Sequence, residues 1–199
     1  MDEPIRRGGR PRRSSAEVLA DAAAELFLEQ GYGRTTVDQI AARAGVSRAT
    51  FFNYFPAKAD VMWLELDAAV AGLPGYLAAS TGSSAVRAVE QALLDAARAH
   101  DPERVPWAVA QAEVMGIGPE LVAGVAVRVT AQHEAVAAFV AGRTGEQPRA
   151  LWPQTVSGAM LGAAAAAFGV WVTDGVGRRA LVEYVAAALT PVVAGLDAR

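Results

Sequence analysis

The stretch Thr35–Lys58, TTVDQIAARAGVSRATFFNYFPAK, decides the fold of the N-terminal part of the chain. Thr36 followed three residues later by Gln39 is a capping-box pattern, which predicts that a helix begins after Thr36. Gly45 ends this helix, because glycine adopts the left-handed backbone conformation at no steric cost. Ser47 can cap a second helix two residues later. So short a connection predicts two helices that cross at a steep angle, which is a helix-turn-helix.

The second helix of this unit carries polar side chains suited to reading DNA. In a DNA-binding helix-turn-helix, the N-terminal residues of the second helix face the base edges in the major groove. Arg48 can form a bidentate pair with guanine, Thr50 can contact a base or a thymine methyl, and Asn53 can read adenine or bond phosphate. Further donors lie at the flanks, where phosphates would be, at Ser47, Tyr54 and Lys58. The alternative from these residues alone is an ordinary helical hairpin with a solvated polar face.

The segment GVSRATFFNYFPAKADV, residues 45–61, resembles the characteristic motif of the TetR family of bacterial transcriptional regulators. The upstream segments GRPRR, LEQGY and TTV are similar to that family too, and the match covers about the first sixty residues. The resemblance implies that this chain is a DNA-binding regulator. Phe52 departs from the family pattern, in which many members carry tyrosine, and it lacks the hydroxyl that would contact a phosphate or base.

The same resemblance assigns DNA contacts residue by residue. Phosphate contacts are implied for Thr36, Ser47, Tyr54 and Lys58, and base-edge contacts for Arg48, Ala49 and Thr50. We add Thr35, beside the helix cap, and Asn53 to the candidate DNA-binding residues. Lys58 is the only lysine of the chain.

Positive charge is concentrated at the N-terminus, although the whole chain has a formal net charge of −3 at pH 7. Residues 1–60 hold nine basic and eight acidic residues, whereas residues 61–199 hold nine basic and thirteen acidic residues. This distribution suits a DNA-binding end more than the total charge suggests. Arg10 and Arg12 belong to a basic arm, which we expect to lie along phosphates or enter the minor groove. The alternative is a solvated tail.

Several classes of protein are disfavoured by what the sequence lacks. There is no cysteine, which excludes disulfides, thiolate zinc sites and cysteine nucleophiles. Neither histidine follows the Glu-x-x-His spacing of di-iron bundles, and no phosphate-binding glycine loop or His-Glu-x-x-His motif occurs. We therefore expect no enzyme activity, no metal and no cofactor. The N-terminus has no apolar run of a secretory signal, so we expect a cytoplasmic protein.

The helical periodicity predicts an all-α protein of about nine helices. We expect a flexible basic arm at 1–13, a three-helix DNA-binding domain with the helix-turn-helix at 14–60, and a C-terminal helical bundle at 61–199 for ligand binding and dimerisation. Ser14 with Glu17 predicts the cap of the first helix. A fourth helix is expected from about Ala57 to Gly72, with Leu73–Gly75 as a second candidate boundary. Five more helices are expected at 84–100, 104–115, 119–142, 149–174 and 177–195.

The segment Ala150–Thr173 has no charged residue and is long enough to cross a membrane. We expect a buried helix and no membrane partner, because most of its residues are alanine or glycine. The TetR resemblance implies that the last two helices form a four-helix bundle with those of a second subunit. The alternative is a helix pair inside a monomer. The residues expected at this interface are Gly158, Gly162, Ala166, Trp171, Tyr184 and Leu189.

TetR-like regulators usually bind a small molecule among the middle helices and then release DNA. Trp107, Gln111 and Met115 recur every four residues, and His133 lies near the apolar side of the next helix. An apolar pocket with a few polar groups is typical of small-molecule sites. We hypothesise that these residues, with His100, line an inducer cavity. The alternative is that they are core or exposed residues.

The sequence as a whole predicts a sequence-specific transcriptional regulator. We expect a repressor that binds a palindromic double-stranded operator as a homodimer, with recognition helices about 34–36 Å apart. A small, largely apolar inducer would release it. The alternative is a DNA-binding regulator without a small-molecule effector, controlled by a partner protein or by abundance.

Overall fold

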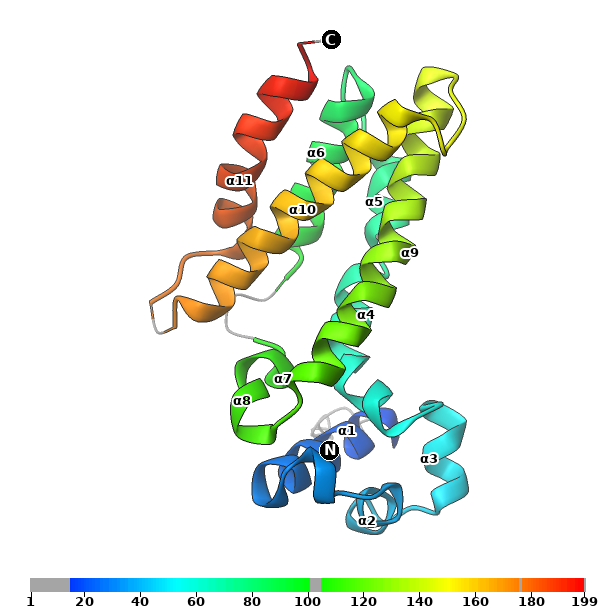
Figure 1. Ribbon diagram of the computed structural model, residues 1–199, viewed down its shortest axis with the longest axis vertical. Coiled ribbons are helices and arrows are strands. Elements are labelled where there is room, and N and C mark those ends of the chain that lie inside the picture. Colours follow the sequence, from blue (N-terminus) through cyan, green and yellow to red (C-terminus); the bar gives the residue numbers. More distant parts are fainter. Residues whose placement is uncertain (1–14, 101–104, 176, 199) are drawn as a thin grey trace, which may run out of the picture. The chain divides into compact units, whose positions relative to one another are not determined.

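A computed structural model describes residues 15–100, 105–175 and 177–198 (Figure 1). Regular structure in these residues is helical throughout, which confirms the predicted all-α class. Arg10, Arg12 and Ser14, on which the basic arm and the first helix cap were predicted, lie outside the described residues. In chain order the helices are α1 (Ser15–Gln30), the 3₁₀ helix η1 (Tyr32–Arg34), α2 (Val37–Arg43), α3 (Arg48–Tyr54), the 3₁₀ helix η2 (Lys58–Trp63), α4 (Leu64–Val70), α5 (Leu73–Ala79), α6 (Ala85–Arg98), α7 (Trp107–Ala110), α8 (Ala112–Met115), α9 (Gly118–Thr144), α10 (Leu151–Thr173) and α11 (Leu181–Leu196).

The chain divides into two compact units. Among the described residues, the first holds those of the range Met1–Leu64 together with Val114–Gly116, and the second holds those of the ranges Glu65–Glu113 and Ile117–Arg199. Leu73–Gly75, the second candidate for a boundary, is instead the start of α5 inside the second unit. Pro74 lies in the first turn of α5, where proline is well accommodated, rather than after the end of the helix before it.

The first unit has a small core made by α1, α2, α3 and η2. Phe51 of α3 is fully buried, and its ring centroid lies 5.5 Å from that of Phe55. Both phenylalanines are therefore core residues of the first unit. Other buried members are Leu19, Leu26, Phe27, Ile40, Ala41, Val61, Met62 and Trp63.

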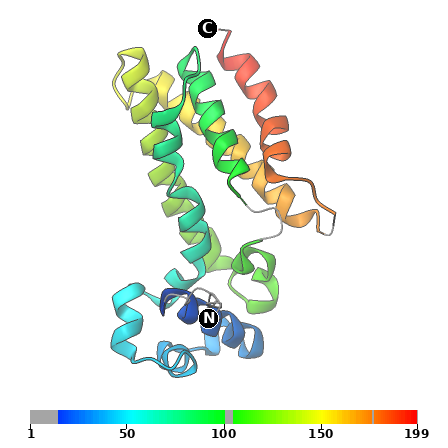
Figure 2. The ribbon, with the colours of Figure 1, turned by 180° about the vertical axis from the view of Figure 1, so that it is seen from behind.

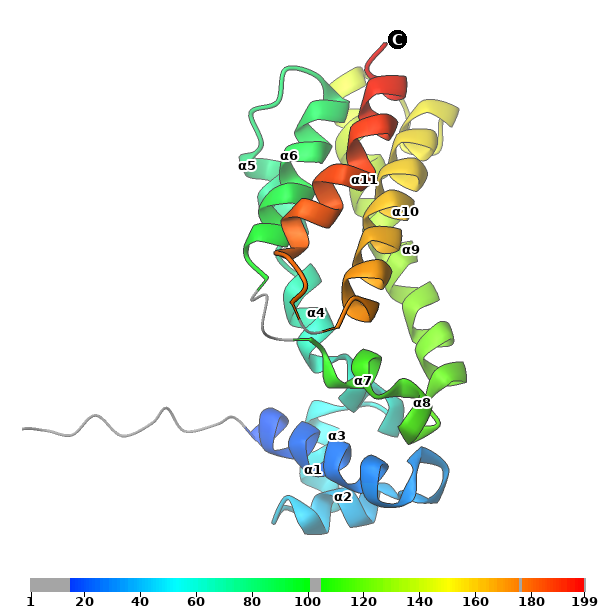
Figure 3. The ribbon, with the colours of Figure 1, turned by 90° about the vertical axis from the view of Figure 1, so that its left-hand side faces the viewer.

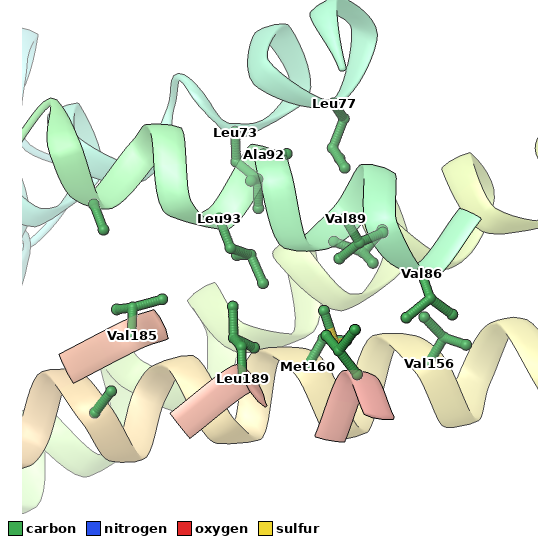
Figure 4. Packing of buried hydrophobic residues seen from close by; sticks show 14 of the residues in the cluster. Leu73, Leu77, Val86, Val89, Ala92, Leu93, Val156, Met160, Val185 and Leu189 are labelled. Carbon is green, nitrogen blue, oxygen red and sulfur yellow. The ribbon is translucent and has the colours of Figure 1, made fainter. Parts of the chain in front are cut away.

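The second unit is a helical bundle built around α6, α9, α10 and α11. Figure 3 shows α11 alongside α6 and α10, and Figure 2 shows α5 and α6 side by side on the face opposite α10. Val86, Val89 and Leu93 follow helical spacing along α6, so one face of this helix is apolar. Figure 4 shows α6 between α5 on one side and α10 and α11 on the other, with Val86 and Leu93 pointing toward α10 and α11. The contacts on the far side come from Val156, Met160, Val185 and Leu189.

Two expected helices are broken in the structure. The single helix expected from Ala57 to Gly72 is a 3₁₀ helix followed by α4, and α5 is an additional helix. The helix expected at 104–115 is interrupted at Gln111, whose φ of −118° and ψ of 15° leave the helical region. Its two parts, α7 and α8, are each a single turn.

Asp197 fastens the end of α11 to the start of α6. Its Oδ1 accepts a hydrogen bond of 2.6 Å from the Ser84 hydroxyl, and its Oδ2 accepts one of 2.8 Å from Arg87 Nε. Ser84 also caps α6 by accepting from the backbone N–H of Arg87. The hydrogen bond from Ser84, followed by that from Arg87, holds the pKa of Asp197 below its usual value.

We expect Asp197→Asn to lower the stability of the second unit at neutral pH and to make it less sensitive to acid. Because the pKa is lower in the folded state, the charged carboxylate stabilises the fold above the unfolded pKa of about 3.8. This contribution is lost as the pH falls below that value and through the folded pKa. Thermal unfolding between pH 7 and pH 2 measures the effect, with Asp95→Asn, whose partner Arg98 is on the same helix, as the control. A difference between Asp197→Asn and the parent that is equally large at pH 7 and pH 2 would contradict this assignment.

Candidate nucleic-acid interface

The helix-turn-helix has the caps and the turn that its sequence predicts. Thr36 Oγ1 accepts from the backbone N–H of Gln39 at 3.3 Å, and Gln39 Oε1 accepts from the backbone N–H of Thr36 at 2.8 Å. Gly45 has a φ of +71°, the left-handed conformation that lets the chain turn after α2. Ser47 Oγ accepts from the backbone N–H of Thr50 at 3.0 Å and so caps α3. Local hydrogen bonding therefore starts both helices.

The outward face of α3 presents an exposed, mainly polar surface. Arg48, Ala49 and Asn53 are exposed, and Tyr54 at the end of the helix is 48% exposed. Thr50 is half-buried, and its hydroxyl lies 2.9 Å from that of Ser47. Phe51 on the opposite side is buried, so core packing fixes which face of α3 points outward. The helix thus offers hydroxyl, amide and guanidinium groups of the kind that read base edges and phosphates.

Thr35 does not belong to this surface, and its assignment as a DNA contact is wrong for its side chain. The residue is only 2% exposed. Its hydroxyl donates to the carbonyl of Gly31 at 2.9 Å and accepts from Gln30 Nε2 at 3.2 Å. Thr35 therefore closes the connection between α1 and α2, whereas the exposed Thr36 carries the cap.

Lys58 is held by contacts inside the first unit. Its Nζ donates to the carbonyls of Tyr32 at 2.7 Å and Thr35 at 2.8 Å, and it lies 3.8 Å from the centroid of the Tyr32 ring. The ammonium thereby ties η2 to the segment that precedes α2. This structural role had no signal in the sequence, and a phosphate contact from Lys58 stays a prediction.

Arg48 has partners on two sides. Its Nη1 donates to Asp38 Oδ2 of α2 at 2.7 Å, and its guanidinium carbon lies 5.3 Å from the centroid of the Phe52 ring. Sequence reasoning missed Asp38, because nothing in a linear pattern shows which residue of α2 comes to face α3. It also treated Phe52 only as the loss of a hydroxyl.

Arg43 braces α2 against α1. Its Nη1 donates to Glu25 Oε2 at 3.0 Å, and its Nη2 donates to Glu29 Oε2 at 2.8 Å. The hydrogen bond from Arg43 lowers the pKa of Glu29, and the two carboxylates raise the pKa of Arg43. All three side chains are well exposed, so the pair orients α2 more than it stabilises the fold.

Three of the residues expected to line an inducer cavity do not share one helical face. The break at Gln111 removes the continuous helical face that Trp107, Gln111 and Met115 were expected to share. Gln111 is exposed, while Met115 is buried and belongs to the first compact unit. A shallow, open pocket of about 290 Å³ lies elsewhere in the second unit. It is lined by Ser84, Ala85, Val86, Thr144, Glu146, Trp152, Leu196 and Asp197.

His133 joins α9 to α10. Its Nε2 lies 2.8 Å from Gln154 Oε1, and its Nδ1 lies 2.9 Å from Ser157 Oγ. Ser157 is fully buried, and its hydroxyl also lies 2.9 Å from the backbone carbonyl of His133. Both ring nitrogens are engaged by α10, so His133 is a structural link, which was the alternative to a ligand contact.

The expected dimer residues fall into three groups by burial. Trp171 and Leu189 are fully buried in the second unit, so they are core residues of the subunit rather than interface residues. Tyr184 is half-buried and bonds Asp174 through its hydroxyl. The small residues Gly158, Gly162 and Ala166, in contrast, are exposed along α10.

By length and composition, α10 could cross a membrane. Of its most apolar stretch of 18 residues, 28% is buried inside the subunit. Its buried stripe faces α9 and α11, and its other side is exposed and apolar. The exposed stripe consists of Leu151, Thr155, Gly158, Gly162, Ala165, Ala166, Gly169, Val170 and Thr173.

Comparison with known proteins covers both units. Residues 19–62 match the family described as bacterial regulatory proteins, tetR family, and residues 83–197 match the MftR C-terminal domain. A candidate mycofactocin biosynthesis transcriptional regulator, MftR of Mycobacterium tuberculosis, is 33% identical over 191 residues, which are 96% of each chain. The HTH-type transcriptional activator FasR of Mycolicibacterium smegmatis is 34% identical over 96 residues, 45% of this chain and 44% of FasR.

Solved structures share the fold. NalD of Pseudomonas aeruginosa, the secondary repressor of the MexAB-OprM multidrug efflux pump, has a TM-score of 0.60 and 22% identity, with 91% of this chain and 96% of NalD covered. The FadR repressor of Thermus thermophilus, in complex with lauroyl-CoA, has a TM-score of 0.57 and 22% identity, with 90% and 93% covered. These likenesses support the fold, and the full-length match to MftR and the two domain matches define the family. The chain belongs to the TetR family of bacterial transcriptional regulators.

Proposed function

We propose that this protein is a repressor that binds a palindromic operator as a homodimer, reads it with α3 and is released by a small, largely apolar ligand. The observation that carries the proposal is the exposed face of α3, with Arg48 at its first position and Asn53 five residues later. Thr36, Ser47 and Tyr54 flank it, exposed and able to bond phosphates. The protein acts by binding, without catalysis, in the cytoplasm.

The homodimer is supported by the unpartnered face of α10. Exposed residues recur there at intervals of three and four, from Leu151 to Thr173, so they form one stripe along the helix. Gly158, Gly162 and Ala166 are small enough to let a second helix approach closely. On α11, Ala187, Pro191 and Ala194 are also exposed at helical spacing. In aqueous solution, an apolar face of this length is expected to be buried against another protein surface. A second copy of the same two helices would provide that surface.

An effector is supported by the relatives and by three buried polar atoms. FadR, which shares the fold, binds lauroyl-CoA. Within the described residues, Glu120 Oε2, Gln132 Oε1 and Arg178 Nη1 are buried without a hydrogen-bond partner. Buried polar atoms are normally paired, so these three are suited to an effector or to bound water. The alternative is control by a partner protein or by abundance, and release of operator DNA by an acyl-CoA series would decide between them.

The target genes are proposed from the relative that matches over the whole chain. MftR is named for mycofactocin biosynthesis, so duplexes from upstream of such genes are the first operators to test. The assignment of the target genes does not depend on which residues of α3 read the operator. Either assignment can therefore fail while the other holds.

Replacing Arg48 with alanine tests the assignment of α3 as the base reader. We expect a loss of about 1–3 kcal/mol in operator affinity and a relaxed preference at one base pair of each half-site. Binding to random duplex should fall less, because it depends on phosphates rather than base edges. Fluorescence anisotropy with operator and random duplexes at fixed salt measures both. Equal losses on the two duplexes would remove Arg48 from the base readers.

A further inference from the structure

The side chain of Arg48 is oriented by neighbours before any DNA is present. Asp38 of α2 accepts a hydrogen bond of 2.7 Å from Arg48 Nη1, and the ring of Phe52 lies 5.3 Å from the guanidinium carbon. The Arg48 and Asp38 side chains are 59% and 64% exposed, and Phe52 is 43% exposed. The three groups therefore lie on the surface around the N-terminal end of the helix that is proposed to read the operator.

These contacts do little for the stability of the unit. An exposed ion pair contributes little to folding, because water and salt screen it. A free arginine side chain nevertheless has many rotamers, which must be restricted before its planar fork can match a guanine edge. Contacts from a carboxylate and from an aromatic face restrict that freedom in the unbound protein. Orienting the fork in advance reduces the ordering cost of base recognition.

The charge of Asp38 acts on DNA binding in a second way. A carboxylate beside Arg48 repels phosphates and takes up one of the five guanidinium N–H donors. It therefore opposes the use of Arg48 as a general phosphate contact, which would be insensitive to sequence. Specificity is the difference between the affinity for the operator and the affinity for DNA of other sequence. Weakening the binding to other DNA therefore raises specificity.

We propose that Asp38 is a specificity-determining positioning residue, which acts together with Phe52 to present Arg48 to a base edge and to keep it from neighbouring phosphates. The inference rests on the proposed role of Arg48 as a base reader. It gives Phe52 a function that needs no hydroxyl, because an aromatic face alone can support a guanidinium.

Removing the carboxylate of Asp38 is expected to raise the affinity for random duplex and to lower the discrimination between operator sequences. Asp38→Ala should strengthen binding to random duplex, since a negative charge leaves the DNA-facing surface. The same variant should lower discrimination at the base pair that Arg48 reads by about 3–10-fold, part of the preference that one bidentate pair supplies. A residue that merely supports the fold would weaken binding to both duplexes. Asp38→Glu, which keeps the carboxylate, should recover most of the discrimination.

The experiment compares these variants on a selected operator, on copies with single base-pair changes, and on random duplex. Arg48→Ala first identifies the base pair whose change no longer matters. Glu25→Ala is the matched control, since it removes one carboxylate from an exposed ion pair on α1 of the same unit. Circular dichroism confirms that each variant is folded.

Three results would overturn the proposal. Asp38→Ala could lower discrimination at that base pair no more than Glu25→Ala does. It could lower discrimination equally when Arg48 is already alanine, which would show that it does not act through Arg48. If Arg48→Ala itself leaves every base preference intact, the proposed reading role fails first and the inference falls with it. The expected result is a loss in the Asp38→Ala single variant that disappears in the Arg48→Ala background.

Discussion

Gly162→Trp is expected to convert the proposed dimer into monomers and to weaken operator binding by about 10²–10⁴-fold, the range by which two linked sites exceed one. Gly162 is exposed near the middle of the apolar stripe of α10, between Gly158 and Ala166. A Cβ built at this position meets no heavy atom within 4 Å in the subunit, so the bulk of the new side chain affects only what packs on the outside. A tryptophan there would keep the facing helix of a second copy at a distance.

The matched control is Gly142→Trp. Gly142 is also an exposed glycine inside a long helix, α9, and a Cβ there likewise meets nothing within 4 Å. Sedimentation equilibrium and operator binding are measured for both variants. A Gly162→Trp protein that remains dimeric with unchanged operator affinity would show that this stripe is not the interface. The Gly142→Trp protein should behave like the parent.

Phe51→Ala is expected to destabilise the first unit by about 3–5 kcal/mol, the usual cost of removing a buried aromatic side chain. Its ring is fully buried and packs on Phe55, so the substitution leaves a cavity under α3. For a unit of this size such a loss is a large part of the total stability, and operator binding should be lost with it. Urea unfolding followed by circular dichroism measures the stability of the unit.

The neighbouring residue supplies the control. Phe52 is 43% exposed, whereas Phe51 is fully buried, so Phe52→Ala should lower stability clearly less than Phe51→Ala does. The same variant is expected to reduce base discrimination through Arg48, as inferred above. Comparable stability losses for Phe51→Ala and Phe52→Ala would contradict the orientation of α3 on which the whole interface depends.

The helix-turn-helix could be predicted from the sequence because local chemistry specifies it. Thr36, Gln39, Gly45 and Ser47 act within three residues of the helix end that each one sets, and the structure confirms all four. The core face of α3 could be predicted as well, since Phe51 and Phe55 are separated by one helical turn. A helix cap needs no information from distant parts of the chain.

The tertiary contacts of the interface could not be predicted in the same way. Thr35 was taken for a DNA contact because it adjoins the cap, yet packing against α1 buries it. Lys58 reaches back to carbonyls of Tyr32 and Thr35, and Asp38 meets Arg48 across the turn. The contacts of Lys58 and Asp38 join residues at least ten positions apart in the sequence. An exposed charged residue also looks alike in sequence whether it is paired or free.

In the second unit, the sequence periodicity predicted where helices occur more reliably than it predicted which residues share a helical face or pack in the core. The four-residue spacing of Trp107, Gln111 and Met115 indicated a shared face, but the backbone leaves the helix at Gln111. The buried Trp171 illustrates a related limit. When a helix is apolar on every side, the sequence pattern does not show which side packs against the subunit core and which side is left for a partner. Trp171 was therefore assigned to the interface although it packs in the core.

The most direct test of the account is the selection of bound duplexes from a random pool by the purified full-length protein at near-physiological salt. A dimer that reads DNA with α3 should recover an inverted repeat whose half-sites are centred about 34–36 Å apart, one helical turn of DNA. The same selection with Arg48→Ala should lose preference at one position of each half-site. Recovery of no common motif by a folded, dimeric protein would contradict sequence-specific operator binding, and a single unrepeated motif would contradict recognition by the dimer.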